Sequence, residues 1–165
     1  MRNFYLIFAF LASLTVSAAH AGDPVVFFGS DDDEMNAAIT DAHASLPAFL
    51  SNGFDPSGTG FGNANLKVGL EADTDGGVEH IWVNSLERDG EAFRGRLANE
   101  PNFRPDLSYG SEISFDATMI SDWSVIVDGQ LYGHYTTRVL VSRLPAEQAA
   151  PIIEMLSDDP IPSGW

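Results

Sequence analysis

The sequence contains no cysteine, and Lys67 is its only lysine. Without cysteine the chain forms neither disulfides nor thiolate metal sites, so its stability has to come from an apolar core. It lacks the clustered lysine and arginine by which proteins bind nucleic acid or anionic lipid. Complete phosphate-loop, dinucleotide-binding and nucleophile-elbow motifs are also missing. These absences argue against a nucleic-acid-binding protein and against several common classes of enzyme.

Residues 1–21 have the features of a signal peptide. Arg2 precedes the apolar run FYLIFAFLASLTVSA, and AHA at 19–21 has the small-x-small pattern of a cleavage site. The run is shorter than the roughly 20 residues of a membrane span. We therefore expect cleavage before Gly22, a periplasmic or secreted domain of residues 22–165, and no membrane contact after cleavage. An uncleaved anchor is the alternative.

Acidic residues dominate what remains. The chain has 24 Asp and Glu against 8 Lys and Arg, a net charge of −16 that becomes −17 once Arg2 is removed. Such a surface repels polyanions and speeds encounter with a basic molecule. The partner suggested by this charge is a basic protein, and the alternative is that the acidity serves solubility or life in a salty habitat.

The first long segment predicts a helix. SDDDEMNAAITDAHASLPAFL has Ser30 and the acids at 31–33 as N-cap candidates, and acids suit the positive end of a helix dipole. Pro47 cannot donate a helical hydrogen bond, so we expect a kink or break near Ala44. Apolar residues at helical spacing should form one narrow buried stripe: Met35, Ala38, Ile39, Ala42 and Leu46.

From Asn65 onward the pattern changes to strands, predicted at 65–72, 78–86, 91–98, 111–117, 119–127 and 130–144. Three Asp-Gly pairs between these runs are hairpin signals. PAEQAAPIIEML then predicts a short final helix that contains a proline. The expected fold class is α+β: an N-terminal helix packed on a twisted antiparallel meander of five or six strands, with partial closure into a barrel as a variant.

Neither metal pattern in the sequence is complete. Acids alternate over residues 71–79 as in a calcium loop, but the position of the closing Glu is Trp82 and the flanks are predicted strands. The mature chain has His43, His80 and His134, none of them spaced by three or four residues. We therefore expect a solvated hairpin turn at 71–79, with no metal and no cofactor.

The stretch GVEHIWVN places a carboxylate, an imidazole and an indole within four positions. On a strand, Glu79 shares one face with Ile81 and Val83, which indicates the core side. His80 and Trp82 then lie together on the opposite face. Either a helix covers that face, or it is an amphipathic surface suited to binding.

The run MISDWSVIV raises a similar question about Asp122. Strict alternation places Trp123 in the core and Asp122 on the same face as the two isoleucines of this run. A carboxylate there is costly unless it is paired, and Arg138 and His80 are the natural partners. A structural ion pair or a turn-capping role is the alternative to a reactive group.

Four motifs occur in one order along the chain: EHIWV (79–83), GRLANEP (95–101), ISDW (120–123) and YGHYTTR (132–138). In that order they resemble the YegJ-like family, a bacterial group of domains of unknown function, and the similarity runs from about residue 33 to residue 140. The resemblance implies an exported bacterial domain and supplies no mechanism. It directs attention to seven positions: Glu79, His80, Trp82, Asn99, Asp122, Trp123 and Arg138.

These observations predict an exported, acidic binding or interaction module of the bacterial envelope, with no catalytic residue assigned. One alternative is a small periplasmic hydrolase that uses Glu79, His80 and Asp122 as acid, base and orienting group. That mechanism needs the three side chains around one concave pocket. A further alternative is an inhibitor or immunity-like protein that acts on a cationic partner.

Overall fold

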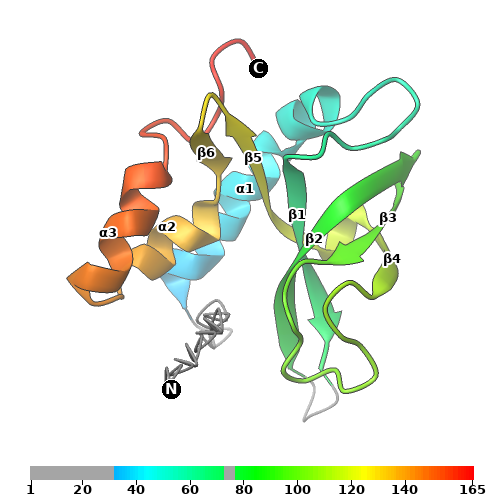
Figure 1. The fold of residues 1–165 in the computed structure, drawn as a ribbon, viewed down its shortest axis with the longest axis horizontal. Helices are drawn as coiled ribbons and strands as arrows, with labels where there is room; N and C mark the ends of the chain where they lie inside the picture. The colour runs from blue at the N-terminus through cyan, green and yellow to red at the C-terminus, as the bar shows by residue number, and fades with distance from the viewer. Residues whose placement is uncertain (1–31, 73–76) are drawn as a thin grey trace, which may run out of the picture.

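A computed structural model describes residues 32–72 and 77–165 of the protein, which form helices beside one sheet (Figure 1). The predicted signal peptide at 1–21, the cap candidates before Asp32 and residues 73–76 of the predicted turn lie outside these residues. The elements are α1 (Asp33–Asn52), β1 (Ala64–Glu71), β2 (Val78–Asp89), β3 (Ala92–Leu97), β4 (Glu112–Asp116), the 3-10 turn η1 (Ala117–Met119), β5 (Ile120–Val127), β6 (Gln130–Gly133), α2 (Tyr135–Val141) and α3 (Ala146–Met155).

Helix α1 begins where the acidic cluster predicts it. The N-cap is Asp32, whose side chain accepts a hydrogen bond of 3.1 Å from the backbone N–H of Met35. The predicted stripe is buried except for Ile39, which is half-buried, and it extends to Phe49. The helix passes Pro47 without interruption, so no break occurs near Ala44. Burial of this stripe stabilises the helix across the proline.

The six strands form one antiparallel sheet in the order β4-β3-β2-β1-β5-β6. Strands β1 to β4 are a meander, and the β5–β6 hairpin pairs with the other side of β1. Since β4 and β6 do not pair with each other, the sheet is open, and the barrel-like variant is not adopted. The α+β prediction, with six strands and a short C-terminal helix, is confirmed.

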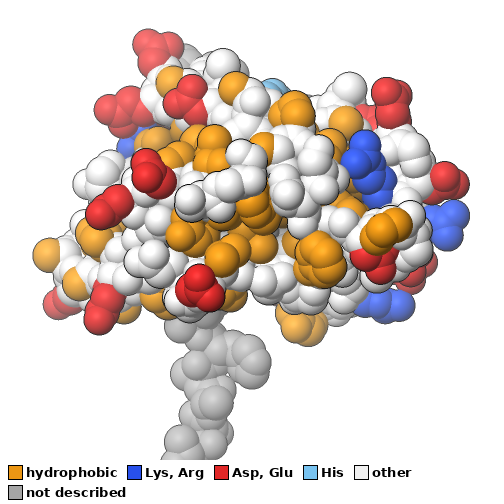
Figure 2. Space-filling model, turned by 90° about the horizontal axis from the view of Figure 1, so that it is seen from above, with side chains coloured by type: hydrophobic (Ala, Val, Ile, Leu, Met, Phe, Trp, Pro, Cys, Tyr) orange, Lys and Arg blue, Asp and Glu red, His pale blue; other side chains and the backbone are white. Residues whose placement is uncertain are grey.

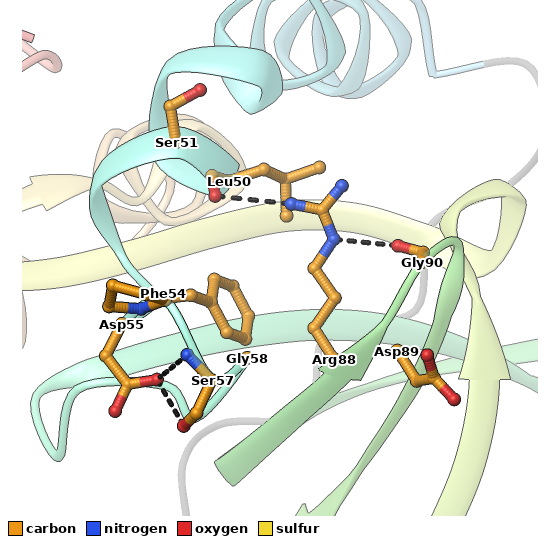
Figure 3. A pocket seen from close by; sticks show the side chains of 10 residues that line it. Leu50, Ser51, Phe54, Asp55, Ser57, Gly58, Arg88, Asp89 and Gly90 are labelled. Atoms are coloured by element: carbon orange, nitrogen blue, oxygen red, sulfur yellow. Dashed lines mark hydrogen bonds between the residues drawn. The ribbon is translucent and has the colours of Figure 1, made fainter.

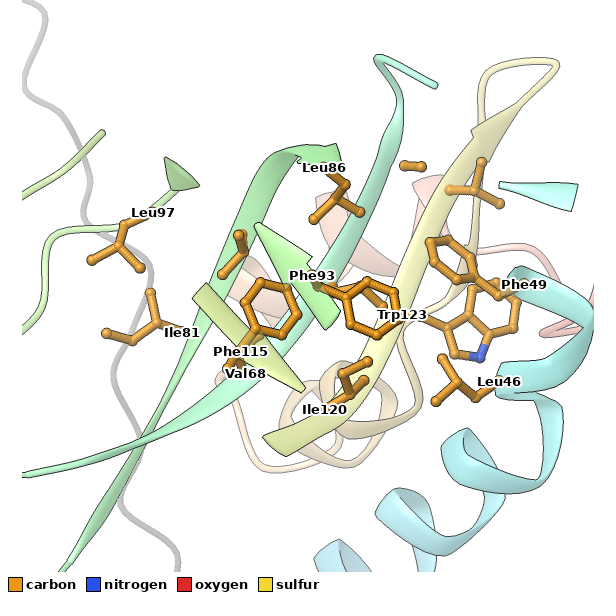
Figure 4. Packing of buried hydrophobic residues seen from close by; sticks show 14 of the residues in the cluster. Leu46, Phe49, Val68, Ile81, Leu86, Phe93, Leu97, Phe115, Ile120 and Trp123 are labelled. Carbon is orange, nitrogen blue, oxygen red and sulfur yellow. The ribbon is translucent and has the colours of Figure 1, made fainter. Parts of the chain in front are cut away.

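The main core lines one face of the sheet, and α1 packs on the end of it formed by β5 (Figure 4). Trp123 is fully buried there, with its ring centroid 5.2 Å from that of Phe49, and its Nε1–H donates a 2.9 Å hydrogen bond to Ser45. Ile81 and Val83 of β2 belong to the same core, as alternation along GVEHIWVN predicts.

A bulge in β5 breaks the alternation expected for MISDWSVIV. The register with β1 shifts so that Lys67 pairs with Asp122 but Val68 pairs with Ile120, which leaves Ser121 as an extra residue. Ile120 therefore lies in the core together with Trp123. The prediction that Ile120 and Asp122 share a face is wrong, because the bulge reverses the direction of every side chain beyond it.

The predicted strand at 130–144 is also wrong beyond residue 133. Strand β6 ends at Gly133, which has φ of +72°, and His134 follows in the left-handed conformation at φ 53°. A side chain at position 133 would meet the carbonyl oxygen of Trp123 at 2.1 Å, so only glycine fits this turn. The chain reverses there and enters helix α2.

Candidate functional site

Three of the seven residues singled out from the sequence, His80, Trp82 and Asp122, lie on the side of the sheet away from the main core, which we call the polar sheet face. Lys67 pairs with Trp82 on one side and with Asp122 on the other, so these three form one row across β2, β1 and β5. His80 pairs with Gly69 in the neighbouring row. The same face also carries three further polar residues: Asn65, Asn84 and Ser124.

Asp122 is completely buried at the centre of this face. Its carboxylate accepts hydrogen bonds from the backbone N–H groups of Trp123 (2.8 Å), Tyr135 (3.2 Å) and Thr136 (2.8 Å), and from the Thr136 hydroxyl (2.6 Å). Two of these N–H groups belong to the first turn of α2, which has no cap from its own N-cap side chain. Asp122 is thus the tertiary cap of α2. The predicted partners Arg138 and His80 are wrong, and the turn-capping alternative is the one observed.

Burial raises the pKa of Asp122 above its ordinary value, while the hydrogen bonds from Thr136 and the charge of Lys67 act in the opposite direction. Lys67 reaches the carboxylate through Thr136, since its Nζ donates to the Thr136 hydroxyl at 3.1 Å and that hydroxyl donates to Asp122. A buried carboxylate and a buried ammonium are thereby connected through a single threonine.

Two aromatic rings shield this charged network from water. The Lys67 ammonium lies 5.5 Å from the centroid of the Trp82 ring, within the range of a cation–π contact. The imidazole of His134 lies 4.9 Å from the same indole. Lys67 is consequently only 8% exposed. Desolvation, Lys67 and Arg138 lower the pKa of His134 from 6.5 to about 4, so this ring is neutral near pH 7.

His80 lies beside this covered network and is exposed to solvent. Its Nδ1 is 2.8 Å from the hydroxyl of Ser121, the bulged residue, and that hydroxyl donates to the Lys67 carbonyl at 3.3 Å. With the hydroxyl proton used in this way, Ser121 accepts from Nδ1–H, and Nε2 of His80 is left as an acceptor. Partial desolvation and the charge of Lys67 lower the pKa of His80. Gly69 makes room for the ring, since a side chain there would lie 3.3 Å from His80 Cε1.

Glu79 points to the other side of the sheet, as alternation predicts. It is 8% exposed, and its carboxylate accepts from the backbone N–H groups of Asn102 (2.7 Å) and Phe103 (3.0 Å). Glu79 therefore anchors the loop between β3 and β4. Asn99 fixes the start of the same loop, because its Oδ1 accepts from the backbone N–H of Trp82 at 3.3 Å.

Arg138 lies on α2, where its Nε donates to the Gly133 carbonyl at 3.0 Å. Its Nη2 is buried and has no hydrogen-bond partner among the described residues. Burial lowers the pKa of this guanidinium. The side chain borders a shallow hollow of about 480 Å³ between α1 and α2, whose rim includes the carboxylates of Glu34 and Asp41. Arg138 thus stabilises the turn into α2, and its interaction with Asp122 is one of charge at longer range.

A second pocket, of about 450 Å³, lies between the end of α1 and the β2–β3 turn (Figure 3). Its polar groups bind one another: Arg88 donates to the carbonyls of Gly90 (2.9 Å) and Leu50 (3.3 Å), and the Asp55 carboxylate accepts from the backbone and hydroxyl of Ser57. None of the predicted site residues lines it.

Within residues 32–72 and 77–165, no three His, Asp or Glu side chains come together in a way that could hold a metal ion. Over the same part of the chain, no helix has the length and apolar character needed to cross a bilayer.

The proposed hydrolase residues are not assembled around one pocket. Glu79 and His80 lie on opposite sides of the sheet, and Asp122 is closed off by its own four donors. The imidazole of His80 contacts a serine instead, and this serine is only 4% exposed. The arrangement offers an exposed imidazole and a half-buried indole side by side on one face of the sheet.

Sequence reasoning missed four residues of this face: Lys67, Gly69, Ser121 and His134. Lys67 could have been found from the sequence, because strand alternation places its side chain on the other face of the strand from the apolar Leu66 and Val68. Gly69 interrupts an apolar strand, which often indicates a close approach by a neighbouring group. Nothing local indicates Ser121 or His134, since both depend on the bulge and on the reversal after β6.

Comparison with known proteins places these motifs in a family. A family model described as "Uncharacterized protein conserved in bacteria (DUF2314)" matches residues 32–152. The chain is 26% identical to the "Uncharacterized protein YegJ" of Escherichia coli K12 over 151 residues, 90% of this chain and 94% of that protein. It is 27% identical over 135 residues to a "Putative ankyrin repeat protein" of Neisseria meningitidis serogroup B, covering 77% of this chain and 53% of that protein. No solved structure matches.

Proposed function

This chain belongs to the DUF2314 family of conserved bacterial proteins, and from that premise we propose that it is an exported, acidic binding module of the bacterial envelope. The polar sheet face is its binding surface, with His80 and Trp82 at the centre. The observation that carries the proposal is the contrast between the exposed His80 and the fully buried Asp122 on the same face.

The buried network gives this surface a fixed shape. Trp82 and His134 are held over Lys67, and Lys67 is linked through Thr136 to Asp122. His80 is oriented by Ser121. Side chains locked in this way lose little conformational entropy when a partner binds, which favours affinity. A face that served packing alone would not need an exposed imidazole held in one orientation.

The charge of the chain supports a basic protein as the partner. The net charge is −16, and in the view of Figure 2 acidic side chains lie mostly toward the rim, with apolar side chains toward the middle and Lys and Arg mainly at one side. A field of this sign steers cationic molecules toward the protein. Inhibition of a cationic protein is one form that such binding can take, and it needs no catalytic group.

Photo-crosslinking tests the binding surface directly. A photo-reactive phenylalanine analogue placed at His80 or at Asn84 should crosslink the same basic protein in intact cells. The analogue placed at Glu147, an exposed residue of α3, is the matched control and should not. In vitro, His80→Ala should weaken binding of that protein without changing the melting temperature, and salt should slow association. Equal crosslinking from Glu147 would refute the assignment of this face.

Export is tested separately by intact-mass measurement. Protein from the periplasmic fraction should begin at Gly22, as the AHA pattern at 19–21 predicts. Recovery of the apolar run of residues 4–18 in that fraction would contradict cleavage.

A further inference from the structure

The two edges of the sheet differ in whether another segment of the chain pairs with them. At the β6 edge the chain after α3 pairs with the strand: Leu156 forms a parallel bridge with Leu131, and the Ser157 N–H donates to the Leu131 carbonyl at 3.0 Å. At the other edge, no strand of the described residues pairs with the outer side of β4. An uncovered edge strand is a ready template for a strand from another chain.

The backbone groups available at this edge follow from the register. Leu97 donates its N–H to the Ser111 carbonyl, and the pairing of β3 with β4 continues in that register. Residues 111, 113 and 115 therefore direct their backbone groups toward β3, because hydrogen-bonded and non-bonded pairs alternate in antiparallel sheets. The N–H and C=O groups of Glu112 and Ser114 point away from the sheet, where an added strand would find them.

The side chains of β4 select which strand can be added. Glu112, Ser114 and Asp116 are exposed on one face, while Ile113 is half-buried and Phe115 is buried on the other. In the antiparallel register that pairs all of β4 with a second copy of itself, Ser114 faces Ser114 and Glu112 faces Asp116. Like charges directly opposite each other destabilise a sheet, so the edge disfavours its own copy.

Glu112 pairs with Arg96 of β3 at 3.1 Å, and Asp116 accepts from the backbone N–H of Thr118 at 2.8 Å. Both carboxylates are exposed and have further acceptor positions, so they favour an added strand of opposite charge. We propose that β4 binds an extended basic segment of a partner protein by strand addition. Such a segment places Lys or Arg beside Glu112 and Asp116 and an apolar side chain beside Ile113, so basic and apolar residues alternate along it. This surface is separate from His80, and the inference stands whether or not the polar sheet face binds a ligand.

Strand addition is tested with a synthetic peptide in which lysine alternates with valine, followed by amide chemical shifts of the labelled protein. Shifts should concentrate at residues 112–116, and a peptide with glutamate in place of lysine should produce none. Ser114→Pro removes an outward N–H without costing a bond to β3, so it should weaken binding by about tenfold or more while the fold persists. Ser114→Thr is the matched control and should bind normally, as should His80→Ala.

A charge reversal gives an independent readout if the proline variant fails to fold. In the self-pairing register, Glu112→Lys places a lysine opposite Asp116 of the second copy. This variant should therefore dimerise in sedimentation experiments, while the parent does not pair at this edge. Adding Ser114→Pro to it should restore the monomer. The inference is overturned if the parent ignores the lysine peptide, if Ser114→Pro binds it normally, or if Glu112→Lys remains monomeric. Those results would mean that the acids of β4 only prevent aggregation.

Discussion

Replacement of Asp122 by alanine should be among the most damaging single changes to this protein. The substitution removes one acceptor that serves three backbone N–H groups and one hydroxyl, and it also removes a carboxylate that is linked through Thr136 to the buried Lys67. Each buried donor left unsatisfied costs about 1–3 kcal/mol. Breaking a buried charge pair costs about 3–5 kcal/mol. These contributions overlap, so we expect a loss of about 3–5 kcal/mol in the free energy of unfolding.

A loss of that size is a large share of the roughly 5–15 kcal/mol that stabilises a typical domain. Urea titration of a chain of residues 22–165, followed by tryptophan fluorescence, measures this loss directly. Asp122→Asn keeps one carbonyl acceptor and should lose about half as much. Glu154→Ala, an exposed acid on α3, is the control and should stay within about 0.5 kcal/mol of the parent. A loss below about 1 kcal/mol for Asp122→Ala would refute the role of Asp122 as the cap of α2.

Three further predictions follow from other contacts. His134 takes up a proton near pH 6.5 in the unfolded chain but only near pH 4 in the folded chain. As the pH is lowered from 6.5 to about 4, the free energy of unfolding should therefore fall by up to about 3 kcal/mol. His134→Asn, which tolerates the left-handed backbone, should flatten that part of a pH series of urea midpoints, and parallel curves would contradict this. Glu79→Ala should speed chymotryptic cleavage after Phe103 by releasing the β3–β4 loop, and an unchanged rate would count against the anchor. Gly133→Ala should lower the free energy of unfolding by about 3 kcal/mol or more, whereas Gly129→Ala, with open space around it, should lower it by about 1 kcal/mol. Thermal melts of the two variants measure the difference, and equal losses would disprove the close contact at Gly133.

The parts of the fold that depend on local signals could be predicted from the sequence. The cap and buried stripe of α1 depend on neighbouring residues, and the 89–90 and 128–129 turns depend on Asp-Gly pairs. The two faces of β2 follow from alternation alone. The sequence therefore placed Glu79, His80 and Trp82 on their correct faces.

The remaining features depend on contacts between distant segments. YTTRVLV in α2 is rich in β-branched residues that favour strands, and its helical state depends on a cap that comes from Asp122. The bulge at Ser121 is a property of the pairing between β1 and β5, so strict alternation along one strand cannot show it. The predicted partners of Asp122 were wrong for the same reason. Its carboxylate accepts mainly from backbone N–H groups of distant residues, and the sequence carries no signal for these.

The burial of Lys67 leaves the protein with very little reactive amine. Its only lysine is 8% exposed beneath Trp82, so the α-amino group at the start of the chain is the main accessible primary amine. Coupling through amines, whether to a dye, a bead or a sensor chip, should therefore attach the folded protein at one end and in one orientation. Unfolding would expose a second amine. The number of labels per molecule, counted by mass, would then report how often the Trp82 cover opens.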